Sequence, residues 1–238
     1  MKKYIIVLIK VLSYLSILEI IIQYVKWKYK YYEINVENGS ATLNEIKELK
    51  ERMEQIYYFI EWWVAGHNIL AIVASLLLFY FFDASYTIPI YIIVFYGLSR
   101  VFEIIIKQIR VILFDTIGVK AIAIKSARRS IILLIHNIIE MIFWFSSSFM
   151  GIILLNKEIV NEGFNKLADI YSYWDFVWCS TLQMTVFSSG CTKLQEIIRP
   201  DNWMSIITQI EILIGFIIIV ISLARLFGIL PNVKQMEK

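Results

Sequence analysis

The hydrophobic residues of this chain gather in long runs that do not alternate with polar residues. Four runs are long enough to cross a bilayer as helices, which takes about 20 apolar residues each. They cover residues 62–82, 86–106, 131–155 and 203–228. A fifth run, residues 4–25, contains Lys10 and Glu19, so it either crosses the bilayer or lies against it as an interfacial helix. The pattern predicts an all-α membrane protein with four to five transmembrane helices.

The composition excludes a soluble enzyme. Of the 238 residues, 59% are hydrophobic and only 18% are charged, whereas a soluble domain carries about 25% charged residues. The two cysteines, Cys179 and Cys191, lack the spacing of metal ligands, so the sequence indicates neither a disulfide framework nor a zinc site. Since the sequence also lacks nucleophile and phosphate-loop motifs, we expect no enzymatic activity and no cofactor.

A basic segment separates the second of the four runs from the third. Residues 107–129 carry six basic side chains against one acidic one, a net charge of +5 in a chain whose total is +3. The six are Lys107, Arg110, Lys120, Lys125, Arg128 and Arg129. The positive-inside rule makes this segment cytoplasmic and places residues 83–87 and 156–202 outside. Its charges alternate with apolar residues, which is typical of an interfacial helix that binds anionic lipid.

A long helix is expected to lead into the first of the four runs. Thr42 and Glu45 fit a capping box, and apolar residues recur in heptad steps from Ile46 to Ile60. We therefore expect a helix from residue 43 to residue 82 whose first half projects into the cytoplasm. Its seam packs either on the same chain or on another subunit. The expected regions of the chain are residues 1–61, 62–128 with the basic linker, 129–230 and a cytoplasmic tail at 231–238.

The segment between the last two runs contains a hydrophobic stretch that is too short to span. Ser172 and Asp175 offer an N-cap, and residues 173–184 then form a helix of about 18 Å, which reaches only half-way through a bilayer. Backbone that turns back inside a membrane is tolerated only where it is buried in protein or lines a water-filled cavity. The pattern predicts a re-entrant pore helix and loop. The alternative is an amphipathic helix that rests on the outer surface.

Three pieces of sequence carry a resemblance to a known family. They read ARRSIILLIHNIIEMIFWF, YWDFVWCSTLQMTV and IEILIGFIIIVISLARLFG. Over residues 129–228 they resemble the outer helix, pore helix and inner helix of the tetrameric potassium-channel superfamily, in the form common among bacterial two-helix channels. The resemblance implies a homotetrameric channel in the cell inner membrane. Its partners would be membrane lipid, its own copies and permeant ions.

The filter of that family reads Thr-Val-Gly-Tyr-Gly, and this sequence departs from it. The corresponding residues are Thr185, Val186, Phe187, Ser188, Ser189 and Gly190, of which the first two match. The family filter needs glycine where alternate residues take left-handed conformations, because a Cβ resists them. We therefore expect a wider or differently coordinated pore that is weakly selective. A non-conducting membrane adaptor built on a channel-like fold is the alternative.

Ionisable residues inside the expected spans are functional candidates, because a bilayer makes them costly. Arg100 and Glu103 lie one turn apart and can pair. His136 and Glu140 stand at i and i+4 on the outer helix, and we expect Glu140 either to bind Arg100 or to stay neutral. These four residues form the expected intramembrane charge network.

Two residues of the inner helix are expected to act on the pore loop. Glu211 is placed to brace the loop from behind by accepting its hydrogen bonds. Gly215, one turn further on, is either a hinge of the helix or a site of close helix packing.

The gating signal is expected to be chemical rather than electrical, because no span carries Arg or Lys at every third position. The basic segment binds either anionic lipid or, with four copies around the axis, a polyanion such as a nucleotide or short oligonucleotide. By analogy with small bacterial channels, such a channel would suit a membrane-depolarising effector of antiviral defence. A transporter or enzyme with a midplane site at Glu140 is a further alternative.

Overall fold

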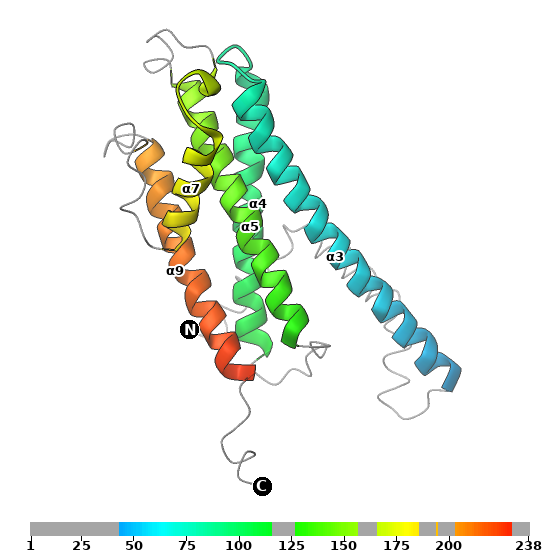
Figure 1. Ribbon diagram of the computed structural model, residues 1–238. Coiled ribbons are helices and arrows are strands. Elements are labelled where there is room, and N and C mark those ends of the chain that lie inside the picture. Colours follow the sequence, from blue (N-terminus) through cyan, green and yellow to red (C-terminus); the bar gives the residue numbers. More distant parts are fainter. Residues whose placement is uncertain (1–42, 116–126, 157–165, 186–193, 195–202, 230–238) are drawn as a thin grey trace. The chain divides into compact units, whose positions relative to one another are not determined.

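The computed structural model describes residues 43–115, 127–156, 166–185, 194 and 203–229. Over these residues the chain is helical and contains no strand (Figure 1). The long helices are α3 (Leu43–Tyr80), α4 (Thr87–Asp115), α5 (Ala127–Leu155) and α9 (Trp203–Ile229). A short helix, α7 (Tyr173–Met184), and a 3-10 turn, η1 (Leu167–Asp169), come between α5 and α9 in the chain.

Four helical segments are long and apolar enough to cross a membrane. They are Tyr58–Tyr80, Thr87–Ile109, Ile131–Leu155 and Trp203–Leu223. Each overlaps one of the four runs expected from the sequence, so the prediction of four helices that are long and apolar enough to span is confirmed. The fifth candidate, residues 4–25, lies outside the described residues.

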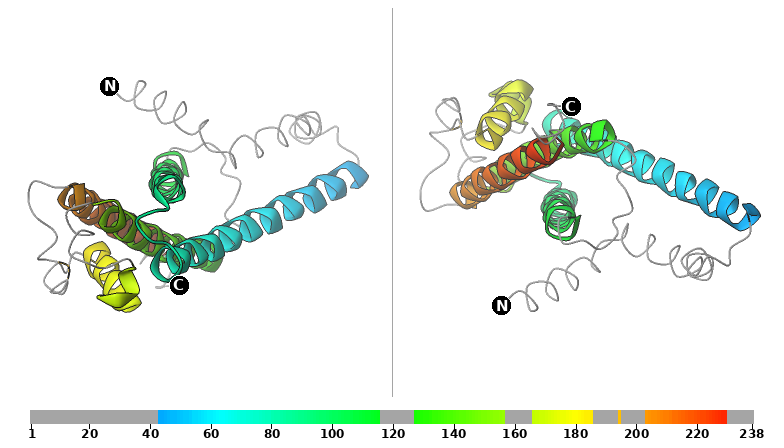
Figure 2. Two further views of the ribbon diagram at one scale, coloured as in Figure 1. Left: turned by 90° about the horizontal axis from the view of Figure 1, so that it is seen from above. Right: turned by 90° about the horizontal axis from the view of Figure 1, so that it is seen from below.

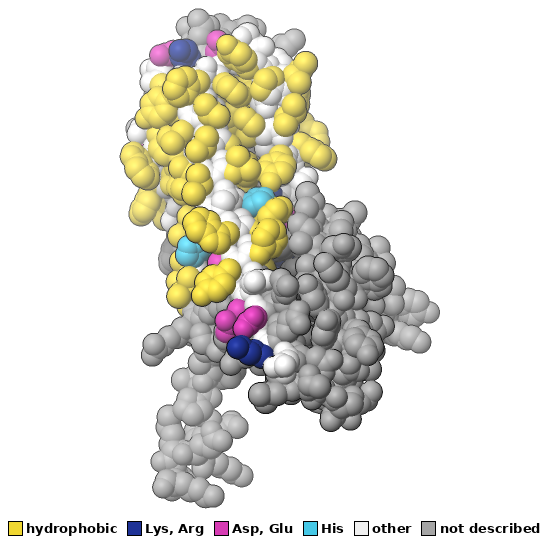
Figure 3. Space-filling view, turned by 90° about the vertical axis from the view of Figure 1, so that its right-hand side faces the viewer, with side chains coloured by type: hydrophobic (Ala, Val, Ile, Leu, Met, Phe, Trp, Pro, Cys, Tyr) yellow, Lys and Arg dark blue, Asp and Glu magenta, His cyan; other side chains and the backbone are white. Residues whose placement is uncertain are grey.

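Hydrophobic side chains cover much of the surface of these helices. Figure 3 shows them gathered in a broad band over one face of the molecule. On α9, Leu213, Phe216 and Val220 follow one another at helical spacing and are 58%, 57% and 49% exposed. Water would strongly disfavour so large an apolar surface, whereas lipid accepts it. The chain is thus an all-α, multi-pass membrane protein.

The chain divides into two compact units, residues 1–66 and residues 67–238. In the described part of the first unit, α3 begins at Leu43, as the sequence predicts, and the rings of Phe59 and Trp63 meet with centroids 5.9 Å apart. The helix ends at Tyr80, two residues before the expected end. Most side chains of the expected heptad seam lie outside the described residues.

Helices α5 and α9 form the centre of the second unit. Figure 2 shows α4 on one side of this pair and α7 on the other. The close approach of α4 to α5 depends on Gly97, because a Cβ there would lie only 2.6 Å from Cε3 of Trp144. Trp144 is consequently almost fully buried between the helices.

The first turn of α7 is attached to the last turns of α3. The hydroxyl of Tyr173 lies 2.8 Å from Oγ of Ser75. The ring of Phe79 makes edge contacts with Tyr173 and Phe176, with centroids 5.6 and 6.2 Å apart. Both partners of Phe79 are buried, so this contact fixes where α7 begins.

The basic segment 107–129 is not one interfacial helix, which corrects that expectation. Helix α4 continues to Asp115, and α5 begins at Ala127. Four of the six basic residues therefore belong to the long helices: Lys107 and Arg110 to α4, and Arg128 and Arg129 to α5. The apolar residues of IIIKQIRVILF keep the helical pattern of α4 going beyond the span, which is why the helix does not stop. Lys120 and Lys125 lie outside the described residues.

Candidate functional site

Two clusters of buried polar groups lie within the candidate spans of the second unit. The Arg100 cluster joins α4 to α5 and consists of Arg100, Glu103, Lys107 and Glu140. The Ser180 cluster joins α7 to α9 and α5 and consists of Ser180, Glu211 and the carbonyl oxygen of Ile142. Each cluster contains one fully buried carboxyl group.

In the Arg100 cluster, opposite charges alternate from the end of the span towards its middle. Nε of Arg100 lies 2.7 Å from Oε1 of Glu140, and Nη1 lies 2.5 Å from Oε2 of Glu103. Oε1 of Glu103 in turn lies 2.7 Å from Nζ of Lys107. The side chains of Arg100 and Glu140 are 4% and 0% exposed, whereas those of Glu103 and Lys107 are 18% and 25% exposed. Both predicted contacts of Arg100 are confirmed.

Arg100 is the group that holds this cluster together, because its guanidinium binds two carboxylates at once. Glu140 depends on this guanidinium more than Glu103 does, because Glu103 also binds Lys107. Over the part of the chain that the structure describes, Oε2 of Glu140 has no hydrogen-bond partner. A buried carboxylate that lost its cation would be left as an uncompensated charge, which is far more costly than the pair itself.

His136 does not join the Arg100 cluster, although the sequence grouped it with Glu140. Its Nδ1 lies 2.9 Å from the carbonyl oxygen of Ile132, one turn back on α5. Since a carbonyl oxygen only accepts, Nδ1 carries the proton of this bond. The i and i+4 spacing puts His136 and Glu140 on one face of the helix, but the imidazole turns towards its own backbone.

Helix α7 forms where the sequence predicts it, at Tyr173–Met184. The backbone N–H of Ser172 donates to Oδ2 of Asp175 at 2.9 Å, which completes a capping box at its start. One side of α7 is buried against neighbouring helices. Its buried residues are Tyr173, Phe176, Val177, Cys179, Ser180, Gln183 and Met184. The exposed residues Trp174 and Trp178 lie one turn apart on another side.

In the Ser180 cluster, a single hydroxyl connects three helices. Oγ of Ser180 donates to Oε1 of Glu211 on α9 and also lies 3.0 Å from the carbonyl oxygen of Ile142 on α5. Ser180 and Glu211 are both fully buried. The expectation that Glu211 accepts a hydrogen bond from the segment between the last two spans is confirmed for this contact. No basic side chain among the described residues bonds to Glu211.

The end of α7 lies against the middle of α9. A Cβ added to Gly215 would overlap the carbonyl oxygen of Met184, the last residue of α7, so only glycine allows this approach. Gly215 is about 18 Å along α9 from Trp203, at 1.5 Å per residue. Of the two interpretations of Gly215, close helix packing is confirmed. Thr185 follows with an exposed side chain, whose Oγ1 donates to the carbonyl oxygen of Thr181 at 3.0 Å.

Sequence reasoning missed two of the contacts that hold α7 in place. The hydroxyl of Tyr173 bonds to Ser75, and Oγ of Ser146 lies 3.4 Å from the carbonyl oxygen of Phe176. A signal was present, because three consecutive serines, residues 146–148, interrupt an otherwise apolar run. Small hydroxyl residues in a membrane helix commonly mark a close contact with another helix.

Several expected site residues lie outside the described part of the chain. These are Val186, Phe187, Ser188, Ser189 and Gly190 of the filter-like segment, together with the side chains of Arg110, Arg128 and Arg129. Cys179 is disulfide-bonded, although the sequence indicates no disulfide framework. The sequence carries no signal for this bond, because two cysteines without a motif do not indicate pairing.

Comparisons with models of protein families, with curated proteins and with solved structures find no match for this chain. The resemblance of residues 129–228 to a channel pore domain therefore rests on the sequence pieces that carry it. Within the described ranges, no three His, Cys, Asp or Glu side chains come together as a metal site. The Arg100 and Ser180 clusters are thus the features from which function is argued.

Proposed function

We propose that this chain is one subunit of a homotetrameric pore-loop ion channel in the bacterial inner membrane. In this proposal α5 is the outer helix, α7 the re-entrant pore helix and α9 the inner helix. The observation that carries it is the contact of Met184 with Gly215, half-way along a helix that is long enough to cross a membrane.

The burial of α7 supports this proposal over a helix lying on the outer surface. A surface helix would contact only the ends of α5 and α9, whereas Ser180 bonds Ile142 and Glu211, which lie well inside the candidate spans. A backbone that ends at mid-depth must be surrounded by protein or water. The exposed Trp174, Trp178 and Thr185 would face neighbouring copies and the shared axis.

The direction of α7 favours a cation as the permeant ion. The carbonyl end of a helix carries a partial negative charge of about half an elementary charge. In the proposed arrangement four such ends point at the axis, next to the Thr185 hydroxyls. The filter-like segment has Phe187 where the family filter has its first glycine. This difference favours weak selectivity, because a continuous stack of carbonyl rings needs residues in left-handed conformations.

The Arg100 cluster supports gating from the cytoplasmic side. It connects Lys107, near the expected cytoplasmic end of α4, to Glu140 in the middle of the outer helix. An anionic lipid or a nucleotide-like polyanion that drew Lys107 away from Glu103 would alter the contact between α4 and α5. A channel of this kind fits a membrane-depolarising effector of antiviral defence.

Reconstitution into planar bilayers tests the proposal. We expect stepwise currents whose reversal potential in asymmetric KCl has the sign of a cation and hardly moves when NaCl replaces KCl on one side. Thr185→Val should change the unitary conductance. Thr208→Val is the matched control, because it makes the same change at a hydroxyl that bonds only to its own helix, at the Met204 carbonyl.

Two results would contradict the proposal. A folded tetramer that stays silent with anionic lipids and with nucleotides would favour the non-conducting adaptor. Proton-coupled uptake that disappears in Glu140→Gln, without unitary currents, would favour a transporter.

A further inference from the structure

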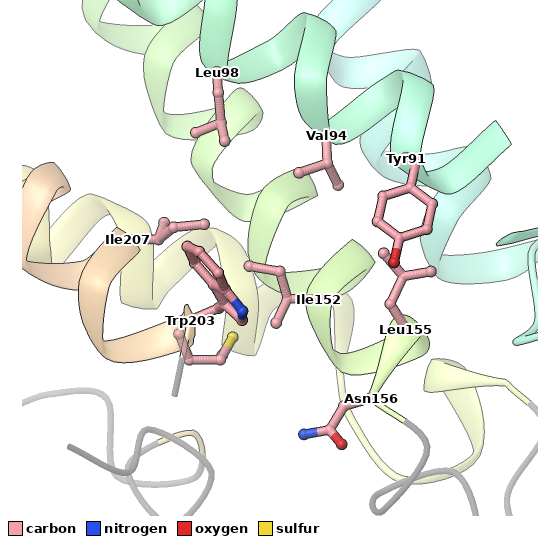
Figure 4. Close-up of a pocket in the computed structure, with 9 residues that line it drawn as sticks. Tyr91, Val94, Leu98, Ile152, Leu155, Asn156, Trp203 and Ile207 are labelled. Atoms are coloured by element: carbon pink, nitrogen blue, oxygen red, sulfur yellow. The ribbon is translucent and has the colours of Figure 1, made fainter. Parts of the chain in front are cut away.

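A groove lies between α4, α5 and α9 at the end of the unit where α5 stops and α9 begins (Figure 4). Its volume is about 470 Å³. Val94 and Leu98 of α4, Ile152 of α5 and Ile207 of α9 supply its apolar walls. No Lys, Arg, Asp or Glu lines it, so charge does not select what it binds.

The mouth of the groove lies at the level of a membrane surface. Asn156 directly follows the span Ile131–Leu155, and Trp203 is the first residue of the span Trp203–Leu223. Tyr91 lies one turn into the span that starts at Thr87. Trp203 and Tyr91 are 72% and 59% exposed, as expected of aromatic side chains at the boundary between lipid and water. Polar atoms are thus found at the rim and apolar side chains below it.

The groove extends from this rim into the hydrocarbon region. Leu98 lies seven residues beyond Tyr91 on α4, about 10 Å deeper at 1.5 Å per residue. A volume of 470 Å³ is typical of ligand sites, which hold roughly 300–1,000 Å³. It is small for a helix of a second copy, because a helix is about 10 Å wide and the groove would hold only about one turn. A thin, flexible apolar chain fits it better.

We propose that this groove is a binding site for one acyl chain of a phospholipid, whose glycerol region lies at Asn156 and Trp203. The site recognises the chain rather than the headgroup, because its walls are apolar and uncharged. The chain would contact α9 on the side opposite α7, since α4 and α7 flank α9 and α5 on opposite sides (Figure 2). The proposal does not depend on ion conduction.

Photo-crosslinking tests this site in the full-length protein. The probe is a phosphatidylcholine with a diazirine near the end of one acyl chain, in vesicles, with crosslinked peptides mapped by mass spectrometry. We expect crosslinks concentrated in residues 91–98 and 203–207. Leu98→Trp, which fills the groove, should lower their yield several-fold, because the indole ring occupies the space that the end of the acyl chain needs.

Ile92→Trp is the matched control, since Ile92 is exposed on the same helix but does not line the groove. It should leave the crosslinks unchanged. If Leu98→Trp does not fold, Val94→Phe fills the same space with a smaller side chain. Phosphatidylglycerol of equal chain length should compete as well as phosphatidylcholine does.

Three outcomes would overturn the proposal. Equal crosslinking in Leu98→Trp and Ile92→Trp would mean that lipid contacts this face without a site. Crosslinks spread evenly over the exposed apolar faces would also mean that lipid contacts the protein without a specific site. A strict requirement for an anionic headgroup would show recognition by charge, which the groove does not explain.

Discussion

Glu140 and Glu211 are equally buried carboxyl groups, but different partners satisfy them. Glu140 binds the guanidinium of Arg100, which lies on another helix and also binds a second carboxylate, that of Glu103. Glu211 has a hydroxyl, that of Ser180, as its hydrogen-bond partner. The Arg100 cluster is held by charge and the Ser180 cluster by a neutral group. The two contacts should therefore respond differently to the same substitution.

The Ser180 cluster also differs from the Arg100 cluster in the number of hydrogens available for its bonds. The single hydroxyl hydrogen of Ser180 faces two acceptors, the Ile142 carbonyl oxygen and an oxygen of Glu211. A neutral Glu211 supplies the missing hydrogen, because its carboxyl group then donates to Ser180 and Ser180 donates to Ile142. Glu140 instead has a guanidinium, that of Arg100, within 2.7 Å of its Oε1. The contact of Arg100 with Glu140 therefore holds α4 to α5 by charge, whereas the contact of Ser180 with Glu211 attaches α7 to α9 through a hydroxyl group.

The largest effect is expected from breaking the Arg100–Glu140 pair. Glu140→Gln should lower the free energy of unfolding by about 3–5 kcal/mol, because it leaves a buried guanidinium without its deepest partner. The double variant Arg100→Met with Glu140→Leu should recover much of this loss. SDS-induced unfolding in mixed micelles measures both. A single-variant loss below about 1 kcal/mol would mean that the pair is solvated.

The contact of α9 with the end of α7 ranks next. Gly215→Ala should cost about 1–3 kcal/mol, because the added methyl group overlaps the Met184 backbone. Gly66→Ala is the matched control. It lies in α3 with nothing within 4 Å of the added Cβ, so it should stabilise the helix by about 0.5–1 kcal/mol. Equal behaviour of the two variants would contradict close packing at Gly215.

A smaller effect is expected when Glu211 becomes a carboxamide. Glu211→Gln should cost less than about 1.5 kcal/mol, because a neutral amide group also donates to Ser180. The same measurement on Glu140→Gln provides the comparison. If the two substitutions destabilise equally, Glu211 is charged and a cation compensates it, so the contrast between the clusters fails.

The smallest effect on stability is expected at Asp83, an exposed carboxylate that accepts hydrogen bonds from Ser85. Oδ1 of Asp83 accepts from Oγ of Ser85 at 2.5 Å and from its backbone N–H at 2.8 Å, and these bonds lower the pKa of Asp83 below its ordinary 3.8. The stabilisation is therefore complete above pH 3.8 and is lost as the pH falls through the lowered pKa. Ser85→Ala should raise the pKa part of the way back, which NMR titration of the Asp83 carboxyl measures. An unchanged pKa would assign the shift to the backbone.

The sequence predicted the helices better than it predicted their contacts. Long apolar runs and the Ser172 cap determine four spans and α7 locally, because length and capping are properties of each segment. The Arg100–Glu140 pair was also predictable, since two opposite charges at similar depth need each other. The extension of α4 to Asp115 was missed, because its basic residues look interfacial although its apolar spacing continues.

Contacts among uncharged residues were not predictable in this way. The contact of Tyr173 with Ser75, and the choice between a hinge and close packing at Gly215, depend on how the helices pack, because serine and glycine have many equivalent uses in a membrane helix. The groove beside Leu98 is a further example, because it exists only where α4, α5 and α9 diverge. Such features follow from tertiary packing and leave no periodic signal.

The proposed pore loop requires the end of α7 to lie deep in the bilayer. Spin labels carried by an unnatural amino acid measure this depth without altering Cys179 or Cys191. A label at Thr185 should lie deeper in the bilayer than one at Ser172 by most of the about 20 Å that α7 spans. It should also collide with a water-soluble nickel chelate far more often than a label at Phe102, which is exposed on α4 at a similar depth. Equal depths at Ser172 and Thr185, near the membrane surface, would contradict the account.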